Sequence, residues 1–310
     1  MDRKDLLSRK VEDMKLSDMN ASELVKQMGA AGGFGAKNLA TAVEIMRGML
    51  ADKSCFRFLS FPACLVATGL RGAIAQAVSK GWFDAVITTC GTLDHDLARA
   101  WGGNYFHGSF ELDDEKLHQI EVNRLGNVLV PNESYGIPLE KRMNPILEEL
   151  VKEKEDWPGH ELVHRFGHHI DDQNSIIYQC AKKKVPVFIP GMTDGAFGTN
   201  LVWFSQDHKF KLDLLADERA LSDIAFDRKI TGALMIGGGI SKHHTIWWNQ
   251  FKGGLDYAVY ITTATQYDGS LSGARLQEAV SWGKIKENAK YVTVDGDATI
   301  LLPLILAALS

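Results

Sequence analysis

The chain has 310 residues, of which 45% are hydrophobic and 24% are charged, as in ordinary globular proteins of one large or two small domains. Its net charge of −5 and the absence of a dense Lys/Arg block argue against a nucleic-acid-binding protein. The four cysteines are scattered singly, the first ten residues have no signal-peptide character, and the last apolar run is too short to span a bilayer. We therefore expect a cytoplasmic protein without a membrane partner.

The first predicted element is an amphipathic helix over residues 36–50, which follows a glycine-rich loop. Its apolar positions recur at helical spacing: Leu39, Val43, Met46 and Leu50. We assign it to an N-terminal helical extension over residues 1–52, ahead of a catalytic domain over residues 53–310. In this position the helix either packs against its own chain or covers a neighbouring active site.

Short apolar runs rich in Val, Ile and Thr then alternate with helical stretches. The predicted strands cover residues 57–61, 84–89, 127–131, 185–190, 232–236, 256–262 and 291–294. Strands that are apolar throughout and are separated by helices indicate a parallel sheet buried on both faces. The predicted fold class is α/β, with a doubly wound, mostly parallel, Rossmann-like sheet covered by helices on both faces.

Most of these strands end in small or polar residues, for example at residues 89–91, 191–195 and 237–239. In open parallel sheets, ligands bind outside the carboxyl ends of the strands, and glycines let a backbone approach a phosphate. A nucleotide or dinucleotide is therefore a reasonable ligand. The alternative stays open, because glycine also ends strands in any α/β fold and no GxGxxG motif is present.

A histidine-rich stretch follows a charged run between residues 152 and 172. His160, His164 and His168 are spaced so that three imidazoles would lie along one helix face, which could suggest a metal site. No carboxylate or cysteine at partner spacing completes a ligand set nearby. We therefore favour a solvated helix and predict no metal.

Lys284 is the strongest candidate for a catalytic group. It lies in the run EAVSWGKIK, where we expect its amine nearly two helical turns past Glu278 and close to Trp282. A lysine becomes a nucleophile when its ammonium loses a proton, and burial against an aromatic ring disfavours the charged form. In the alternative reading, Trp282 and Ile285 face the core and Lys284 is an ordinary surface charge.

Four long motifs in order make the chain resemble the deoxyhypusine synthase family. They are TTCGTLDHDL (88–97), NRLGNVLVPNESYG (123–136), PVFIPGMTDGAFG (186–198) and the stretch from GALMIGGGISKHH to SWGKIK (232–286). The resemblance runs from about residue 55 to residue 305. It implies a homotetrameric, NAD-dependent transferase that moves the 4-aminobutyl group of spermidine, through an imine on an enzyme lysine, to a lysine of the hypusine-containing translation factor.

The resemblance also implies roles for individual residues. Lys284 would form the imine and His243 would move protons. The polyamine would be bound by Trp282, Glu278, Asn132 and Tyr135. NAD would be bound by Thr89, Cys90, Gly91, Asp194, Gly238, Gly239, Thr263, Ala264, Asp268, Ser272, Asp297 and Ala298. Without the resemblance, Trp282 would be a core residue, Glu278 a solvated charge, His243 a helix cap, and the Asp-Gly pairs simple turns.

The chain departs from the eukaryotic pattern of the family at four positions, in a manner that indicates a prokaryotic variant of archaeal type. Thr199 and Leu271 stand where carboxylates are expected, His95 replaces one acidic residue of a pair, and Cys64 replaces an asparagine. Each lost carboxylate removes a charge-assisted hydrogen bond worth about 1.5–3 kcal/mol, which affects which amine is accepted. The alternatives are a homospermidine-type transferase with a free amine acceptor, a donor such as agmatine, and a silent NAD-binding paralogue.

Overall fold

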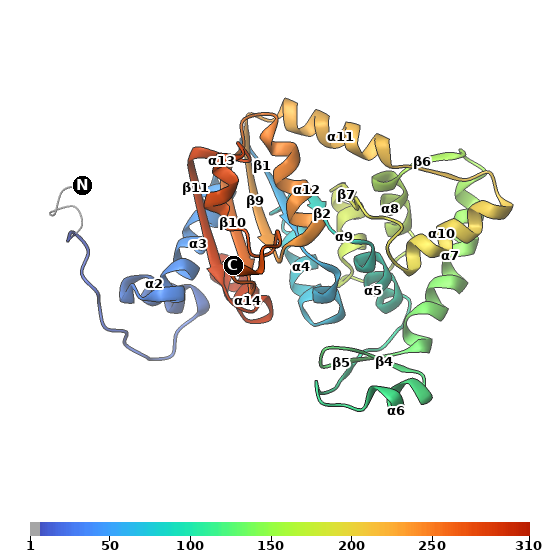
Figure 1. Cartoon of the computed structure of the whole chain (residues 1–310), viewed down its shortest axis with the longest axis horizontal. Helices are drawn as coiled ribbons and strands as arrows, with labels where there is room; N and C mark the ends of the chain where they lie inside the picture. The colour runs from blue at the N-terminus through green and yellow to red at the C-terminus, as the bar shows by residue number, and fades with distance from the viewer. Residues whose placement is uncertain (1–6) are drawn as a thin grey trace.

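The computed structural model describes residues 7–310, and a six-stranded parallel sheet lies at its centre (Figure 1). The strands occur in the spatial order β11-β10-β9-β1-β2-β7. Their bounds are Cys55–Ser60 (β1), Ala85–Ile87 (β2), Val187–Phe188 (β7), Ile230–Ile236 (β9), Leu255–Thr262 (β10) and Ile285–Asp295 (β11). Six of the seven predicted strands are therefore confirmed as members of this sheet.

The strand order is that of a doubly wound fold built from two halves. The first half runs outward as β1, β2 and β7, and the second half runs outward on the other side as β9, β10 and β11. β1 and β9 pair in parallel at the middle, where the direction of winding reverses. Ligands of such sheets bind at this switch point, outside the carboxyl ends of the strands. The predicted fold class is confirmed.

Helices cover both faces of the sheet, and each face has its own apolar core. α3 (Phe34–Ala51), α14 (Ala298–Leu309) and α4 (Leu70–Ser79) form one layer, and α12 (Gly239–Gln250) and α13 (Leu276–Ser281) form the other. Successive residues of a strand face opposite sides. Accordingly, Phe58 of β1 packs in the core under α12 and Leu59 packs in the core under α3.

The remaining helices extend the molecule beyond β7. They are α5 (Cys90–Ala100), α6 (Asp114–Gln119), α7 (Gly136–Leu150), α8 (Gly159–Gly167), α9 (Ile176–Lys183), α10 (Ala196–Asp207) and α11 (Leu214–Asp227), with 3-10 turns η1 (Ala63–Ala67), η2 (Asn132–Ser134) and η3 (Gln266–Asp268). A parallel pair, β6 (Asp156–Pro158) and β8 (Lys211–Asp213), joins two of the connections in this region.

The prediction that residues 127–131 form a strand of the parallel sheet was wrong. They form β5 (Val128–Pro131), which pairs antiparallel with β4 (Val122–Leu125) and with β3 (Phe106–His107) in a separate sheet. β4 and β5 are joined by only two residues, Gly126 and Asn127, and Gly126 has φ +61. Such a tight turn can connect only antiparallel neighbours.

The N-terminal residues that are described include α2 (Ala21–Ala31), whose first turn is closed by a capping box between Asn20 and Glu23. The predicted helix over residues 36–50 is confirmed as α3. Its buried side chains pack on β10 and β11, so this helix covers one face of the sheet. The domain boundary at residue 52 stays a prediction. Within residues 7–310, every helix is too short or too polar to cross a bilayer.

Candidate active site

Lys284 lies in a short connection between a helix and a strand, and its side chain is buried. α13 ends at Ser281, Gly283 takes the left-handed conformation with φ +67, and β11 begins at Ile285. The expectation that Lys284 continues the helix of Glu278 was therefore wrong, because the glycine turns the chain back toward the sheet. Lys284 is 8% exposed, whereas Trp282 is 67% exposed. The alternative interpretation, with Lys284 on the surface and Trp282 in the core, was therefore wrong.

The amine of Lys284 lies between two indole rings. Its Nζ is 5.3 Å from the ring centre of Trp282 and 5.7 Å from the ring centre of Trp247 in α12. An ammonium ion or a cationic substrate is attracted to the face of such rings. The two tryptophans thus form an aromatic slot around the amine, with Trp282 at its exposed side.

His243 belongs to the same cluster because it lies one helical turn before Trp247. The centres of these two rings are 5.5 Å apart. Burial lowers the pKa of His243 below its usual value, and the neighbouring positive charges of Lys284 and His244 lower it further. His243 is therefore a neutral imidazole at neutral pH, able to accept a proton.

Lys242 is an ammonium group that our sequence reasoning missed. It is 1% exposed, and its Nζ donates to the carbonyl oxygens of Leu271 (2.9 Å) and Ala274 (2.6 Å) and lies 3.7 Å from the ring centre of Tyr260. Burial lowers its pKa to about 8, opposed by the carboxylate of Glu278. Glu278 is itself exposed on α13, within electrostatic range of this buried amine.

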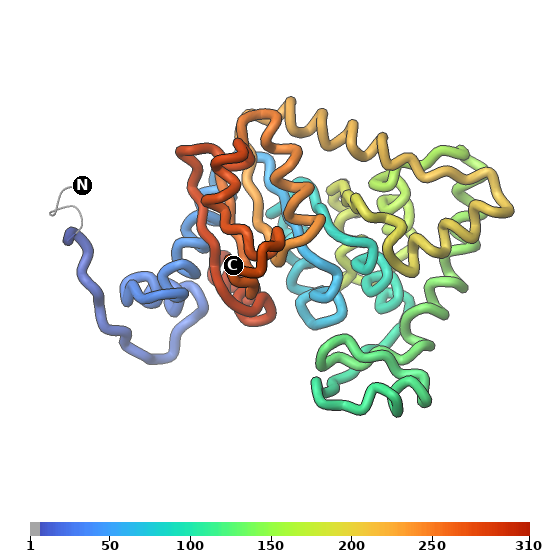
Figure 2. Tube along the Cα trace, viewed as in Figure 1, coloured from blue at the N-terminus to red at the C-terminus, as the bar shows by residue number. Residues whose placement is uncertain are grey.

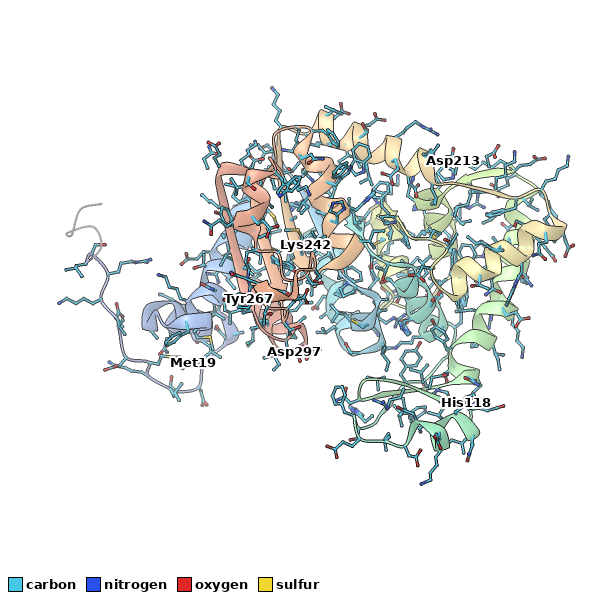
Figure 3. All side chains as sticks on the ribbon, viewed as in Figure 1. Met19, His118, Asp213, Lys242, Tyr267 and Asp297 are labelled. Atoms are coloured by element: carbon cyan, nitrogen blue, oxygen red, sulfur yellow. The ribbon has the colours of Figure 1, made fainter. Side chains whose placement is uncertain are left out.

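The predicted cofactor residues of the C-terminal half meet at the carboxyl ends of three adjacent strands. Gly238 and Gly239 follow β9, four residues follow β10, and Asp297 and Ala298 follow β11. The four after β10 are Thr263, Ala264, Asp268 and Ser272. Figure 3 marks Lys242, Tyr267 and Asp297 on this C-terminal part of the chain, and His118 on α6, far from them.

Close packing of two loops shapes this edge. The hydroxyls of Tyr260 and Thr262 donate to the carbonyl oxygen of Ser272 at 2.7 and 3.0 Å, which holds the loop over residues 266–274 in place. A Cβ atom at Gly238 would overlap Ser272, so the β9–α12 turn must be glycine there. α12 then begins without a side-chain cap, and such a helix start can bind a phosphate through its free N–H groups.

The other predicted cofactor residues follow β2 and β7 at the same edge of the sheet. Thr89 is the N-cap of α5, and its hydroxyl accepts from the backbone N–H of Ala63 at 3.1 Å. The Cys90 thiol is buried, which raises its pKa to about 12, so only its backbone could contact a ligand. Gly91 lies against Ala63, and Asp194 is exposed before α10.

Asn132 and Tyr135 line a separate cavity of about 810 Å³, between the β4–β5 hairpin and helices α7 and α10. The Tyr135 hydroxyl donates to Asp94 at 2.9 Å, and Asp94 also accepts from the first N–H groups of α10. Burial raises the pKa of Asp94, and it lowers the pKa of His95 to about 4. Thr199 lies in this cavity, whereas Leu271 lies in the loop that Lys242 holds.

One chain does not bring all the predicted residues together. Lys284, Trp282 and His243 cluster around α12 and β11, whereas Asn132 and Tyr135 lie with the β4–β5 hairpin. Figure 2 shows the hairpin segment, in green, well apart from the C-terminal strands, in red. The cofactor residues lie between them along the sheet edge. In the described part of the chain, no group of three or more His, Cys, Asp or Glu side chains is arranged to hold a metal ion.

Sequence reasoning also missed Trp247, although a signal was present. Gly239, His243 and Trp247 are spaced by four, so they share one helix face. That face extends over about 12 Å from the glycine turn at the sheet edge to Trp247, whose ring centre is 5.7 Å from the Lys284 Nζ. The arrangement provides a buried nucleophile, a neutral base beside it, and an aromatic surface for a cationic substrate.

Comparison with known proteins finds a matching family model and similar curated proteins of the same description. The family model described as deoxyhypusine synthase matches residues 23–309. A curated probable deoxyhypusine synthase of Thermoplasma acidophilum is 53% identical over 309 residues, covering 99% of both chains. One of Sulfolobus acidocaldarius is 50% identical over 310 residues, covering 100% of this chain and 99% of the relative.

Solved structures match the fold. A crystal structure from Entamoeba histolytica, assigned as a deoxyhypusine synthase, superposes with a TM-score of 0.64 at 21% identity, covering 95% of this chain and 96% of that chain. The complex of AgrE with ornithine and NAD+ superposes with a TM-score of 0.52 at 15% identity, covering 96% of this chain and 34% of that chain. Because the identities of 21% and 15% are low, these two similarities show only that the folds are alike.

Proposed function

Because the chain belongs to the deoxyhypusine synthase family, we propose that it transfers the 4-aminobutyl group of spermidine to a specific lysine of the hypusine-containing translation factor in the cytoplasm. The observation that carries this proposal is the buried amine of Lys284 between two indole rings, next to a neutral histidine. A surface lysine has neither the shielding nor the base that an amine nucleophile needs.

The residues at the sheet edge fit NAD. The Gly238 turn leaves no room for a side chain, α12 begins without a side-chain cap, and Asp268 and Asp297 are exposed carboxylates that can accept from ribose hydroxyls. When bound, NAD would accept a hydride from the carbon beside the secondary amine of spermidine and would return it later.

The chain's own groups would carry the aminobutyl fragment. His243 accepts a proton from Lys284, whose free amine attacks the oxidised carbon of spermidine, and diaminopropane leaves. The fragment is then held on Lys284 as an imine, with Trp282 and Trp247 against its charged end. The lysine of the translation factor displaces Lys284 in the last exchange.

We further propose that the working unit is a homotetramer in which one subunit supplies Lys284 and another supplies Asn132 and Tyr135. In one chain these groups lie apart, because Lys284 lies between α13 and β11, whereas Asn132 and Tyr135 line the cavity beside the β4–β5 hairpin, α7 and α10. Two aromatic side chains beside Lys284 are exposed, Trp282 at 67% and Trp247 at 40%. A second copy of the chain would cover them and complete the site.

A second candidate keeps the same imine but uses a small amine as acceptor or donor. Thr199 lines the cavity of Asn132 and Tyr135 without a charge, so this cavity has lost one anchor for an ammonium group. Homospermidine-type synthesis, or agmatine as donor, would suit such a cavity. This candidate differs from the first in the fate of the aminobutyl group.

The test is mass spectrometry of the translation factor after incubation with the enzyme, NAD and spermidine. We expect the mass of one aminobutyl group on a single lysine, and no such mass with the Lys284→Arg variant. An unmodified factor together with a new polyamine in solution would favour the second candidate. An unmodified factor without any new amine would contradict both.

A further inference from the structure

The histidine-rich stretch forms a feature that the proposed transferase does not use. His160, His164 and His168 are spaced by four along α8, and residues 160–164 read HELVH, the spacing with which two helical histidines bind zinc in metalloproteases. His168 follows the last residue of α8 but keeps a helical backbone, with φ −76 and ψ −15. Side chains four residues apart therefore remain neighbours up to this position.

Of the three histidines, His160 has a carboxylate partner of its own. Its Nδ1 lies 2.6 Å from Oδ1 of Asp217 in α11, and its backbone N–H donates to the same oxygen. This long-range partner could not be seen from residue spacing. The ring of His160 contacts Phe188, whereas the ring of His164 contacts that of His168.

His164 and His168 do converge. Their Nε2 atoms are 3.1 Å apart, with ring centres 4.7 Å apart and ring planes at 90°. With metal–nitrogen distances of about 2.0–2.1 Å, two ligands of one ion lie about 2.9 Å apart at a right angle and about 3.4 Å apart in a tetrahedron. The observed separation lies between these values and is that of a hydrogen bond, in which one ring donates its N–H to the other. An ion would displace this shared proton, and the rings would turn so that both nitrogens face the ion.

We propose that His164 and His168 form a two-histidine site for a divalent transition-metal ion at the end of α8. The pair supplies two cis nitrogen ligands, and water supplies the rest, since no third His, Cys, Asp or Glu ligand converges here in the part of the chain that the structure describes. His164 lines an open cavity of about 510 Å³, which leaves room for these waters.

The surroundings are compatible with an added cation. The positive charge of Arg165 is paired with Glu153, and that of Lys154 with Glu161, so two nearby cations are compensated. Lys184 lines the same cavity and remains a repulsive charge. The carboxyl end of α8 carries the negative end of the helix dipole, which favours a cation there.

The chemistry of the ligands selects the ion. Imidazole suits Cu²⁺, Ni²⁺ and Zn²⁺ and does not suit Mg²⁺ or Ca²⁺, and among the first three Cu²⁺ binds such a site most tightly. The site lies on α8, beyond β7, whereas Lys284 lies before β11 at the other side of the sheet (Figure 1). Occupation of the site is therefore expected to leave the transfer reaction unchanged.

The test compares four forms of the full chain after removal of metal by a chelator: the natural sequence, His164→Asn, His168→Asn and the matched control His169→Asn. His169 is exposed and adjacent in sequence, but it is not part of the converging pair. Titration calorimetry with CuCl₂ and with NiCl₂ gives the affinity, and electron paramagnetic resonance of the one-to-one Cu²⁺ complex gives the number of bound nitrogens.

We expect one ion per chain to bind at least tenfold more tightly to the natural sequence and to His169→Asn than to His164→Asn or His168→Asn. The spectrum should indicate two nitrogen ligands in the natural sequence and in His169→Asn. MgCl₂ should give no such difference. Equal affinities in all four forms, or an equal loss in His169→Asn, would overturn the proposal, and thermal unfolding without metal establishes that all four forms are folded.

Discussion

At the scale of single residues, two buried lysines on neighbouring segments have different surroundings, and we propose different roles for them. The Lys242 amine donates to two carbonyl oxygens and lies against the Tyr260 ring, whereas Lys284 lies between indole rings. An amine that holds a loop with two of its three N–H donors and packs on a ring is poorly placed to attack a substrate. We therefore assign Lys242 to positioning of the loop over residues 266–274 and Lys284 to chemistry.

Replacing Lys242 by methionine tests this division. The change keeps the length of the side chain but leaves the carbonyl oxygens of Leu271 and Ala274 without their charged donor, and each such bond is worth about 1.5–3 kcal/mol. We expect the KM for NAD to rise by tenfold or more, with a smaller change in kcat. A fall in kcat alone, with KM for NAD unchanged, would place Lys242 in the chemical step instead.

His95 gives a prediction for the dependence of stability on pH. Burial lowers its pKa to about 4 in the folded chain, against an ordinary value of 6.5 when unfolded. Between these values the unfolded state binds more protons than the folded state, so the free energy of unfolding falls as the pH falls. At 1.36 kcal/mol per pKa unit, the loss from pH 7 to pH 5 is about 2 kcal/mol.

The measurement is urea unfolding at pH 7 and pH 5 for the natural sequence and for His95→Asn. Comparing the two forms cancels the other titrating groups, including Asp94. The variant is expected to lose about 2 kcal/mol less than the natural sequence over this interval. Identical losses in the two forms would mean that His95 titrates normally.

At the scale of elements, the turn from β9 into α12 joins the cofactor edge to the catalytic helix. Gly238 lies against Ser272 so closely that a Cβ atom does not fit. Gly238→Ala should push the 266–274 loop away and weaken NAD binding by tenfold or more, as measured by quenching of tryptophan fluorescence. Gly33→Ala is the matched control, because its Cβ would meet open space, and we expect it to bind NAD normally. Unimpaired binding by Gly238→Ala would contradict the assignment of this turn.

Much of this element-level picture could be predicted from the sequence. Parallel strands that are buried on both faces have sequences of continuous apolar residues, and β9 and β10 show this pattern over most of their length. Because these strands are parallel, the small residues that follow them lie at the same edge of the sheet. His243 and Trp247 could also have been paired, because spacing by four along a helix is a local property.

Other features depend on contacts between distant segments. The run of β5 looks like a buried strand, and only the Gly126-Asn127 turn before it indicates an antiparallel hairpin. The burial of Lys242 arises from a loop about thirty residues away in sequence, and Asp217 reaches His160 from another helix. Gly283 ended the helix before Lys284, which the apolar pattern around it concealed.

At the scale of the whole molecule, the separation of Lys284, which lies before β11, from Asn132 and Tyr135, which line the cavity beside the β4–β5 hairpin, predicts complementation between subunits. Lys284→Arg and Tyr135→Phe should each be strongly impaired when pure. If the two groups come from different subunits, mixed oligomers contain some sites with both natural residues. We expect such mixtures, unfolded and refolded together, to recover a substantial fraction of the natural activity.

The control is the same mixture made from separately refolded variants, which should stay impaired until subunits exchange. A mixture of Lys284→Arg with Lys284→Ala should recover nothing under any condition, because every site then lacks the amine. Native mass spectrometry shows whether the co-refolded Lys284→Arg and Tyr135→Phe variants form mixed oligomers. If mixed oligomers form but regain no activity, both groups act within one subunit.

The most direct test of the central claim is reductive trapping on the enzyme itself. The chain is incubated with NAD and spermidine, treated with borohydride and digested, and the peptides are sequenced by mass spectrometry. We predict an aminobutyl group on Lys284, and its disappearance when NAD is omitted or when Lys284 is arginine. Trapping of the fragment on Lys242 or another lysine, with Lys284 unmodified, would contradict the account.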